Sequence, residues 1–140
     1  MKISARNVLA GTVSKITKGA VNAEVALALQ DGDTVVAIIT NHSVDSLGLQ
    51  PGGSAYAVIK ASEVMVGKGV ENAKLSARNV LPGEVARLEQ GAVNSEVEIR
   101  LAGGTAVVAS ITKASVQALD LKQGDLVSAI VKASNVLVGV

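Results

Sequence analysis

The sequence predicts an all-β protein that consists of two tandem modules, each with one short helix. Three observations predict it: the chain repeats itself once, its apolar residues alternate with a period of two, and its core must be built almost without aromatic side chains. Hydrophobic residues make up 49% of the 140 residues, yet Phe and Trp are absent and Tyr56 is the sole aromatic residue. We therefore expect cores of Val, Ile, Leu and Ala, and the Cβ-branched members of that set favour strands.

The duplication is visible when the chain is aligned with itself at an offset of about 72 residues. Four pairs of matching segments carry the alignment: Ser4–Leu9 with Ser76–Leu81, Gly19–Asn22 with Gly91–Asn94, Val35–Ala37 with Val107–Ala109, and Lys60–Ser62 with Lys132–Ser134. A repeat of this kind indicates two copies of one structural unit. We expect a first module over residues 1–68, a linker over 69–72 and a second module over 73–140.

Alternation of apolar residues predicts the strands. Ala23, Val25, Leu27 and Leu29 alternate with polar or small residues, which is typical of a strand with one buried face. The other strands of the first module are predicted where Val and Ile are enriched. These strands cover residues 3–17, 34–40, 54–61 and 63–66.

One segment departs from the strand pattern and predicts a helix. Within Asn41–Leu49 apolar residues lie three apart, Thr40 or Asn41 can cap the first turn, and Gly48 can end the helix. Turns are expected at Lys18-Gly19 and at Gln30–Asp33. Five strands with a helix after the third is the order of an OB-type Greek-key barrel. The sequence therefore predicts two tandem OB-like Greek-key β-barrels.

Modules of this size need support from neighbours. A barrel of about 65 residues buries only about 60% of its unfolded surface, and a chain without Cys cannot form a disulfide. We expect exposed β-surfaces of neighbouring modules to bury one another in a homo-oligomer.

Composition argues against several classes of protein. The 13 Lys and Arg residues nearly balance the 12 Asp and Glu residues, whereas a general nucleic-acid binder carries a basic excess. An oligonucleotide-binding OB fold is a further alternative, but base stacking needs aromatic platforms that this chain almost lacks. No apolar run reaches the length of a transmembrane helix, and the start of the chain lacks a signal-peptide pattern. We expect a cytoplasmic protein that binds neither nucleic acid nor membrane.

The repeated polar residues are candidates for an anion site. Alternate residues of a strand share a face, so Ser4 can project beside Arg6, and Lys60 beside Ser62. A tetrahedral dianion needs this mixture of planar guanidinium, point charge and hydroxyl or amide donors. The alternative is that these are solvated residues at strand ends that discourage sheet aggregation.

Two further repeated segments have a functional and a structural interpretation. Thr40 and Ser43, with their counterparts Thr112 and Ser115, begin the predicted helices, where they can contact an anion or cap the helix. The segment Gly19–Asn22 and its counterpart are expected first of all to form hairpin turns.

No set of residues predicts catalysis. Glu24 and Glu96 occupy equivalent positions without a partner His or second acid, so we interpret them as solvated or interface residues. His42 is the sole histidine and its counterpart is Ala114, so no duplicated metal site with direct side-chain coordination is expected. We expect no enzyme activity and no covalent cofactor.

Three spaced motifs together resemble the signature segments of the molbindins, which are Mop-type molybdate-binding proteins. The motifs are Ser4–Val8 (SARNV), Gly19–Val25 (GAVNAEV) and Val58–Ser62 (VIKAS). The resemblance covers essentially the whole chain in both halves, so the chain is similar to a molbindin with two tandem Mop/TOBE modules. It implies OB-like barrels, a homo-oligomer around a three-fold axis, and intracellular storage of molybdate or tungstate at interfaces between modules.

The resemblance also implies which residues bind the oxyanion. The main set is Ser4, Arg6, Lys60, Ala61 and Ser62, with Ser76, Arg78, Lys132, Ala133 and Ser134 in the second module. Weaker candidates are Thr40, Ser43, Thr112 and Ser115, and a second class of site near the symmetry axis would involve Ala20, Val21, Asn22, Ala92, Val93 and Asn94. Glu63 stands where the second module has Asn135, so the two modules need not bind equally. The alternative function is an oxyanion-sensing regulatory module that acts on a transporter or transcription partner.

Overall fold

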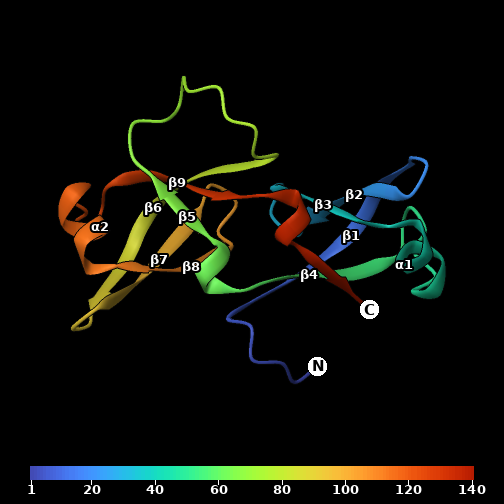
Figure 1. Cartoon of the computed structure of the whole chain (residues 1–140), viewed down its shortest axis with the longest axis horizontal. Helices are drawn as coiled ribbons and strands as arrows, with labels where there is room; N and C mark the ends of the chain where they lie inside the picture. The colour runs from blue at the N-terminus through green and yellow to red at the C-terminus, as the bar shows by residue number, and fades with distance from the viewer.

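The computed structural model describes all residues 1–140 and forms two curled five-stranded sheets side by side along the long axis of the molecule (Figure 1). The first repeat contains β1 (Asn7–Lys18), β2 (Asn22–Leu29), β3 (Thr34–Thr40), α1 (Asn41–Ser46), β4 (Ser54–Ile59), the 3-10 turn η1 (Ala61–Glu63) and β5 (Met65–Gly67). The second repeat contains β6 (Asn79–Gln90), β7 (Asn94–Leu101), β8 (Ala106–Thr112), α2 (Lys113–Ala118), β9 (Leu126–Val131), the 3-10 turn η2 (Ala133–Asn135) and β10 (Leu137–Gly139).

The predicted fold class is confirmed, with corrections to the limits of three strands. The first strand is predicted from residue 3 but begins at Asn7. The fourth is predicted to reach residue 61 but ends at Ile59, because the chain turns into η1. The fifth is predicted over residues 63–66 but covers Met65–Gly67, because Glu63 belongs to η1. The predicted helix after the third strand is present in both repeats. None of the helices is long and apolar enough to cross a lipid bilayer.

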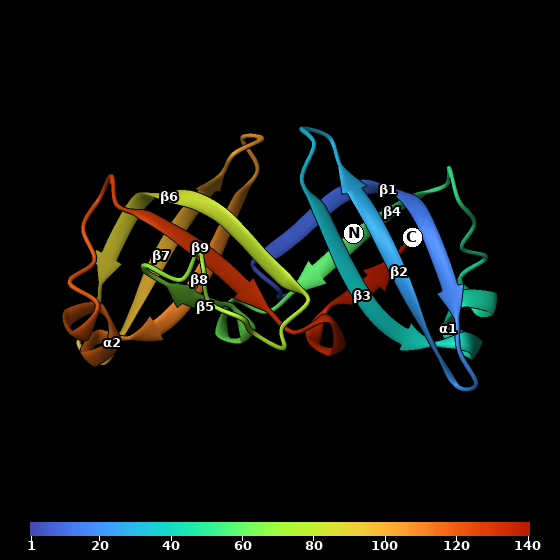
Figure 2. The ribbon, with the colours of Figure 1, turned by 90° about the horizontal axis from the view of Figure 1, so that it is seen from above.

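The two repeats exchange their last strands, which the sequence did not predict. The strand order is β10-β4-β1-β2-β3 in the first sheet and β5-β9-β6-β7-β8 in the second. Thus β5 of the first repeat pairs with β9, with Met65 opposite Ile130, and β10 of the second repeat pairs with β4, with Leu137 opposite Val58. Figure 2 shows β10 lying along β4 near the C-terminus. Each folded sheet therefore needs residues from both repeats.

The predicted alternation is confirmed in the core. Ala23, Val25, Leu27 and Leu29 are buried along β2, and none of them is more than 4% exposed. On β7 of the second repeat, Val97, Ile99 and Leu101 are buried at the equivalent positions. A connected cluster of 27 buried apolar residues includes side chains from both sheets, so the two sheets share a core.

Close packing of β1 against β2 requires a glycine. A Cβ added at Gly11 would lie 2.7 Å from the Ala28 carbonyl oxygen, and one at the equivalent Gly83 would lie 2.5 Å from the Arg100 carbonyl oxygen. Each glycine precedes a β-bulge, which increases strand curvature. The bend lets the long first strand of each repeat pair with two neighbours and curl the sheet.

Two buried asparagines fasten the sheets to each other. The Asn7 side chain donates to the Val108 carbonyl (2.8 Å) and accepts from the Val108 N–H (2.7 Å). Asn79 makes the same pair of hydrogen bonds to Val36, at 2.8 and 2.7 Å. Val36 and Val108 lie on β3 and β8, which are edge strands. Each asparagine side chain therefore forms hydrogen bonds with main-chain groups that would otherwise be unpaired at a sheet edge. We call this contact, with the two exchanged strands, the joint.

The residue directly before the linker, Lys68, is anchored to the second repeat. The Lys68 ammonium donates to the Asp120 carbonyl at 2.9 Å and to the Asp125 carboxylate at 3.0 Å. The hydrogen bond from the Lys122 N–H, together with the Lys68 ammonium, holds the pKa of Asp125 below its ordinary value of 3.8. The residue equivalent to Lys68 is Val140, so the first sheet has no matching anchor.

Loss of an asparagine at the joint should destabilise the whole chain. Asn7→Ala or Asn79→Ala leaves a buried main-chain N–H and carbonyl without partners, and we expect the free energy of unfolding to fall by about 2–4 kcal/mol. Urea denaturation followed by far-ultraviolet circular dichroism measures this change. The exposed linker residue Asn72 provides the control, since Asn72→Ala should change stability by less than about 0.5 kcal/mol. Equal effects at the three positions would contradict the role of the joint.

The anchor at Asp125 predicts a pH dependence. Because its folded-state pKa is lowered, the ionised group stabilises the fold above its unfolded-state pKa, and this contribution is lost as the pH falls through the folded-state pKa. Asp125→Asn should therefore lower the melting temperature at pH 7, and the difference from wild type should shrink below about pH 4. Thermal denaturation of wild type and variant at pH 7 and below about pH 4 tests this pH dependence, with Glu71→Gln as the exposed control. A difference that does not change with pH would refute it.

Candidate functional site

The structure brings each predicted arginine and lysine to the same end of a strand pair. The pairing of β1 with β4 ends at Asn7 opposite Ile59; Arg6 directly precedes Asn7, and Lys60 directly follows Ile59. The pairing of β6 with β9 likewise ends at Asn79 opposite Val131, next to Arg78 and Lys132. Each repeat thus has one arginine and one lysine at the end of its central strand pair.

A surface pocket in the second repeat brings more of the predicted residues together. Ser76, Ala77 and Lys132 line a pocket of about 450 Å³, whose other walls come from β5 (Met65–Gly67), from residues on either side of and within the linker, and from Leu119 and Ile130 of the second repeat. Two residues of the main predicted set, Ser76 and Lys132, therefore share one depression. The exchanged strand β5 forms part of its wall, so this pocket depends on both repeats.

The 3-10 turns supply main-chain donors beside the lysines. The Glu63 N–H donates to the Lys60 carbonyl at 2.9 Å, and the Asn135 N–H donates to the Lys132 carbonyl at 2.9 Å, so each turn begins directly after a lysine. The first N–H groups of a helical turn have no partner within the turn. Ala61, Ser62, Ala133 and Ser134 stand at these positions. The turn η1 packs on β8 and η2 on β3, so both lie at the joint.

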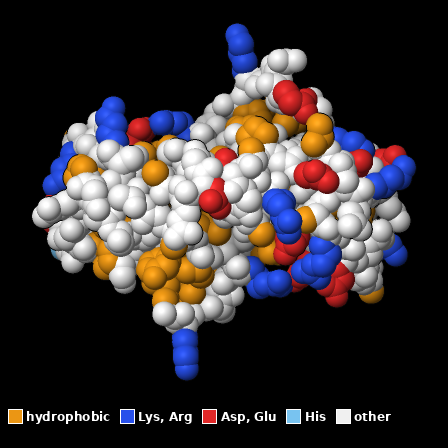
Figure 3. Space-filling view, turned by 180° about the vertical axis from the view of Figure 1, so that it is seen from behind, with side chains coloured by type: hydrophobic (Ala, Val, Ile, Leu, Met, Phe, Trp, Pro, Cys, Tyr) orange, Lys and Arg blue, Asp and Glu red, His pale blue; other side chains and the backbone are white.

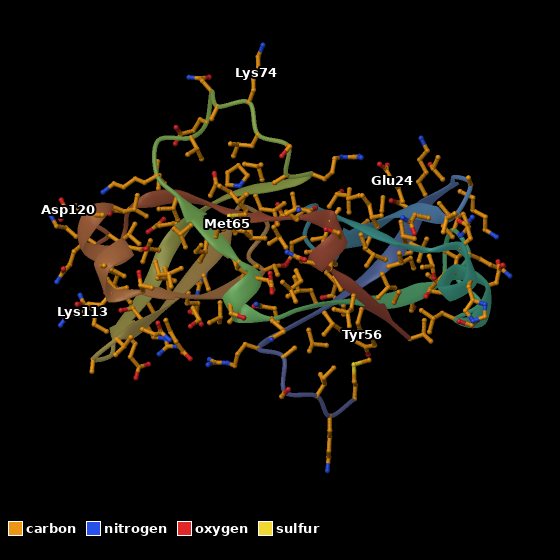
Figure 4. The ribbon with its side chains drawn as sticks, viewed as in Figure 1. Glu24, Tyr56, Met65, Lys74, Lys113 and Asp120 are labelled. Atoms are coloured by element: carbon orange, nitrogen blue, oxygen red, sulfur yellow. The ribbon has the colours of Figure 1, made fainter.

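Each arginine also contacts a carboxylate across the joint. The Arg6 Nη1 atom pairs with Glu96 Oε1, and Arg78 Nη1 pairs with Glu24 Oε1. Glu24, labelled in Figure 4, projects from β2 on the side where β6 begins. We interpret the two glutamates from the sequence as solvated or interface residues, and both descriptions apply: each contacts the other repeat, and the side chains of Glu96 and Glu24 are 36% and 43% exposed. Their pairing with the arginines was missed, although both residue types recur at the same offset in the sequence.

The two cation pairs have different surroundings. Glu96 also approaches Arg87, with 3.9 Å between Glu96 Oε2 and Arg87 Nη2, whereas the equivalent of Arg87 is Lys15. The Asn135 amide donates to Glu63 at 2.9 Å, which directly links the two 3-10 turns. The first repeat therefore carries one more negative charge next to its Lys-Ala-Ser segment than the second.

The weaker candidates form structural contacts. Thr40 Oγ1 accepts from the Ser43 N–H, and Thr112 Oγ1 accepts from the Ser115 N–H, both at 3.1 Å, so the threonines cap α1 and α2. These helices lie at opposite ends of the molecule, whereas the 3-10 turns lie near its middle (Figure 2). The structure does not group these four residues with the arginines and lysines by any hydrogen bond.

The Gly-Ala-Val-Asn segments form the predicted hairpin turns. The Gly19 N–H donates to the Asn22 carbonyl at 2.7 Å, and the Gly91 N–H donates to the Asn94 carbonyl at 2.9 Å. The Val21 and Val93 side chains at the turns are 69% and 74% exposed. Ala20, Ala92 and the two asparagines of these turns are exposed as well. The turns thus present apolar side chains to solvent.

Comparison with known proteins gives consistent matches over the whole chain. The TOBE domain model matches residues 3–66 and 75–138. The molybdenum-pterin-binding protein MopA of Rhodobacter capsulatus is 44% identical over 137 residues, which cover 98% of this chain and 52% of MopA. The molybdenum transport protein ModE of Azotobacter vinelandii is 39% identical over 140 residues, which cover 100% of this chain and 52% of ModE. The chain thus spans about half the length of these curated relatives.

A solved structure matches at full length. The cytoplasmic molybdate-binding protein ModG, crystallised with molybdate bound, superposes with a TM-score of 0.96 at 49% sequence identity, covering 100% of this chain and 99% of ModG. The superposition extends over both sheets, so ModG and this chain share the arrangement of the two halves.

Proposed function

The chain belongs to the TOBE-domain family, and we propose that it binds molybdate without changing it chemically, at sites built at the joint. The observation that carries the proposal is that an arginine and a lysine flank the same end of a strand pair in both repeats, with a 3-10 turn directly after the lysine. The likeness to ModG, which was crystallised with molybdate, supports the same ligand class.

The chemistry of these groups suits a tetrahedral dianion. A unit charge pair at 4 Å contributes about 4 kcal/mol at an effective dielectric constant near 20, so Arg6 and Lys60 together attract a doubly charged ligand strongly. Hydroxyl and main-chain donors at Ser4, Ala61 and Ser62 would fill the remaining oxygen acceptors. No acid–base pair is needed, and we propose no catalysis.

Selectivity between molybdate and sulfate would come from the size of the cage. The two anions have the same charge and shape, but molybdate has longer bonds to oxygen. A rigid cage can discriminate between them by the spacing of its donors. The buried Asn7 and Asn79 hydrogen bonds hold the joint in place, and this rigidity supports such discrimination.

We also propose the finer points that the resemblance implies. Tungstate would bind at the same sites, the protein would store the oxyanion in the cytoplasm, and the exposed hairpin turns would approach a second class of site between chains. The names of relatives such as MopA mention a molybdenum-pterin. We favour the inorganic oxyanion, because a pterin ring would stack on aromatic side chains and this chain has only Tyr56.

The alternative function is oxyanion sensing within a regulatory system. The ModE relatives support it, since this chain matches about half of their length. Oxyanion-dependent association with a transporter or transcription partner would distinguish sensing from storage.

We propose that the chain assembles into a homo-oligomer, with a trimer favoured. Large apolar side chains are exposed on the outer faces of both sheets, including Val8, Tyr56 and Leu137 on the first and Met65 and Leu126 on the second. Figure 3 shows hydrophobic side chains gathered in patches near the upper and lower edges of one face. Contiguous exposed apolar surface often marks an interface with another protein.

Removal of both arginines should abolish most binding. Arg6→Ala combined with Arg78→Ala removes one cation from each proposed site, and we expect the affinity for molybdate to fall at least about tenfold, equivalent to 1.4 kcal/mol. Isothermal titration with molybdate, tungstate, sulfate and phosphate measures this loss. Arg100→Ala, at an exposed strand position without an ion pair, is the control. Unchanged affinity in a folded double variant would refute the proposed sites.

The oligomer should depend on the apolar faces. Sedimentation of the wild type at micromolar concentration should give about three times the 14.1-kDa mass of the chain. Tyr56→Glu combined with Leu137→Glu should shift the distribution towards monomer, because both side chains would bring charge into the interface. A stable, well-folded wild-type monomer would contradict the proposal.

A further inference from the structure

Each arginine of the proposed sites already has an anionic partner within the chain. Arg6 pairs with Glu96 and Arg78 with Glu24, and in both cases the carboxylate comes from the other sheet. The arginine side chains are 48% and 49% exposed, and those of Glu96 and Glu24 are 36% and 43% exposed. An incoming anion therefore meets a guanidinium whose charge is already neutralised.

The exposure of these pairs means that an anion can displace the carboxylate. Ion pairs in contact with solvent contribute little to stability, because water and salt screen them. The carboxylate contacts only one of the five N–H donors of the guanidinium. A ligand can thus begin to bind through the remaining donors before the glutamate is released.

Displacement favours ligands with two negative charges. A monoanion that replaces a glutamate gains about as much attraction to the arginine as the carboxylate loses. A dianion gains about twice as much from the same cation, and again from the neighbouring lysine, because Coulomb energy is proportional to charge. Releasing the glutamate from the arginine costs the same free energy whichever anion binds, so the anion with the stronger attraction to the two cations gains net binding.

We infer that Glu24 and Glu96 act as resident counter-ions which set a charge threshold for the two sites: tetrahedral dianions displace them, and monoanions of the same shape do not. This inference rests on the proposed function and adds a specificity role for two residues outside the proposed oxyanion set. The glutamates act through the arginines and do not bind the ligand.

A pair of probes that differ only in charge tests the threshold. Molybdate and perrhenate are both tetrahedral oxyanions, with two negative charges and one. Wild type should bind molybdate and give no measurable heat with perrhenate. Glu24→Gln combined with Glu96→Gln should bind molybdate about tenfold more tightly and acquire perrhenate binding, because the neutral amide competes weakly for the guanidinium. Glu98→Gln, which removes the same charge from β7 at a residue without an ion pair, should leave both titrations unchanged.

The outcomes separate the threshold from the proposed function. If wild type binds molybdate but the double variant binds it more weakly or gains no perrhenate binding, the glutamates position the arginines and the threshold is wrong. If wild type binds neither anion, both the proposed function and the inference fail. Circular dichroism checks the fold, and should the double variant unfold, each single glutamine variant tests the threshold at one of the two sites.

Discussion

Four hydrogen bonds between the side chains of Asn7 and Asn79 and the edge strands β8 and β3 hold the two sheets in one fixed relation. An edge strand exposes unpaired main-chain groups that favour aggregation. A side-chain amide carries one donor and one acceptor arm, as a main-chain unit does, and can satisfy such an edge. The asparagines therefore join the sheets and protect their edges at the same time. The exchanged strands β5 and β10 extend this contact, so that neither repeat completes its sheet alone.

The joint fixes the main chain from which the proposed binding groups project. Arg6 directly precedes Asn7, and Arg78 directly precedes Asn79, so each guanidinium starts from a main chain that is fixed by its buried neighbour. The 3-10 turns after Lys60 and Lys132 pack on the same edge strands. The arginine and lysine side chains thus project from a main chain that is held in place, which lowers the entropic cost of ordering them around a ligand.

The sequence alone predicted the features that depend on local pattern. Alternation along Ala23–Leu29 identified a strand with one buried face, and the apolar spacing after Thr40 identified a capped helix. The shared end of β1 and β4, which Arg6 and Lys60 flank, also follows from strands of one repeat. The exchange of β5 and β10 could not be predicted, because a short apolar strand has the same pattern whichever sheet receives it. The pairing of Arg78 with Glu24 depends on that long-range arrangement, and the start of β1 at Asn7 depends on the burial of its side chain at the joint.

The proposed sites place the oxyanion where the two repeats meet. Anomalous diffraction from crystals grown with tungstate measures the position of the bound ion directly. We expect peaks within hydrogen-bonding distance of Arg6 with Lys60 and of Arg78 with Lys132. Peaks found only at the outer helices or hairpin turns, with both arginines still paired to Glu96 and Glu24, would show that the sites lie elsewhere.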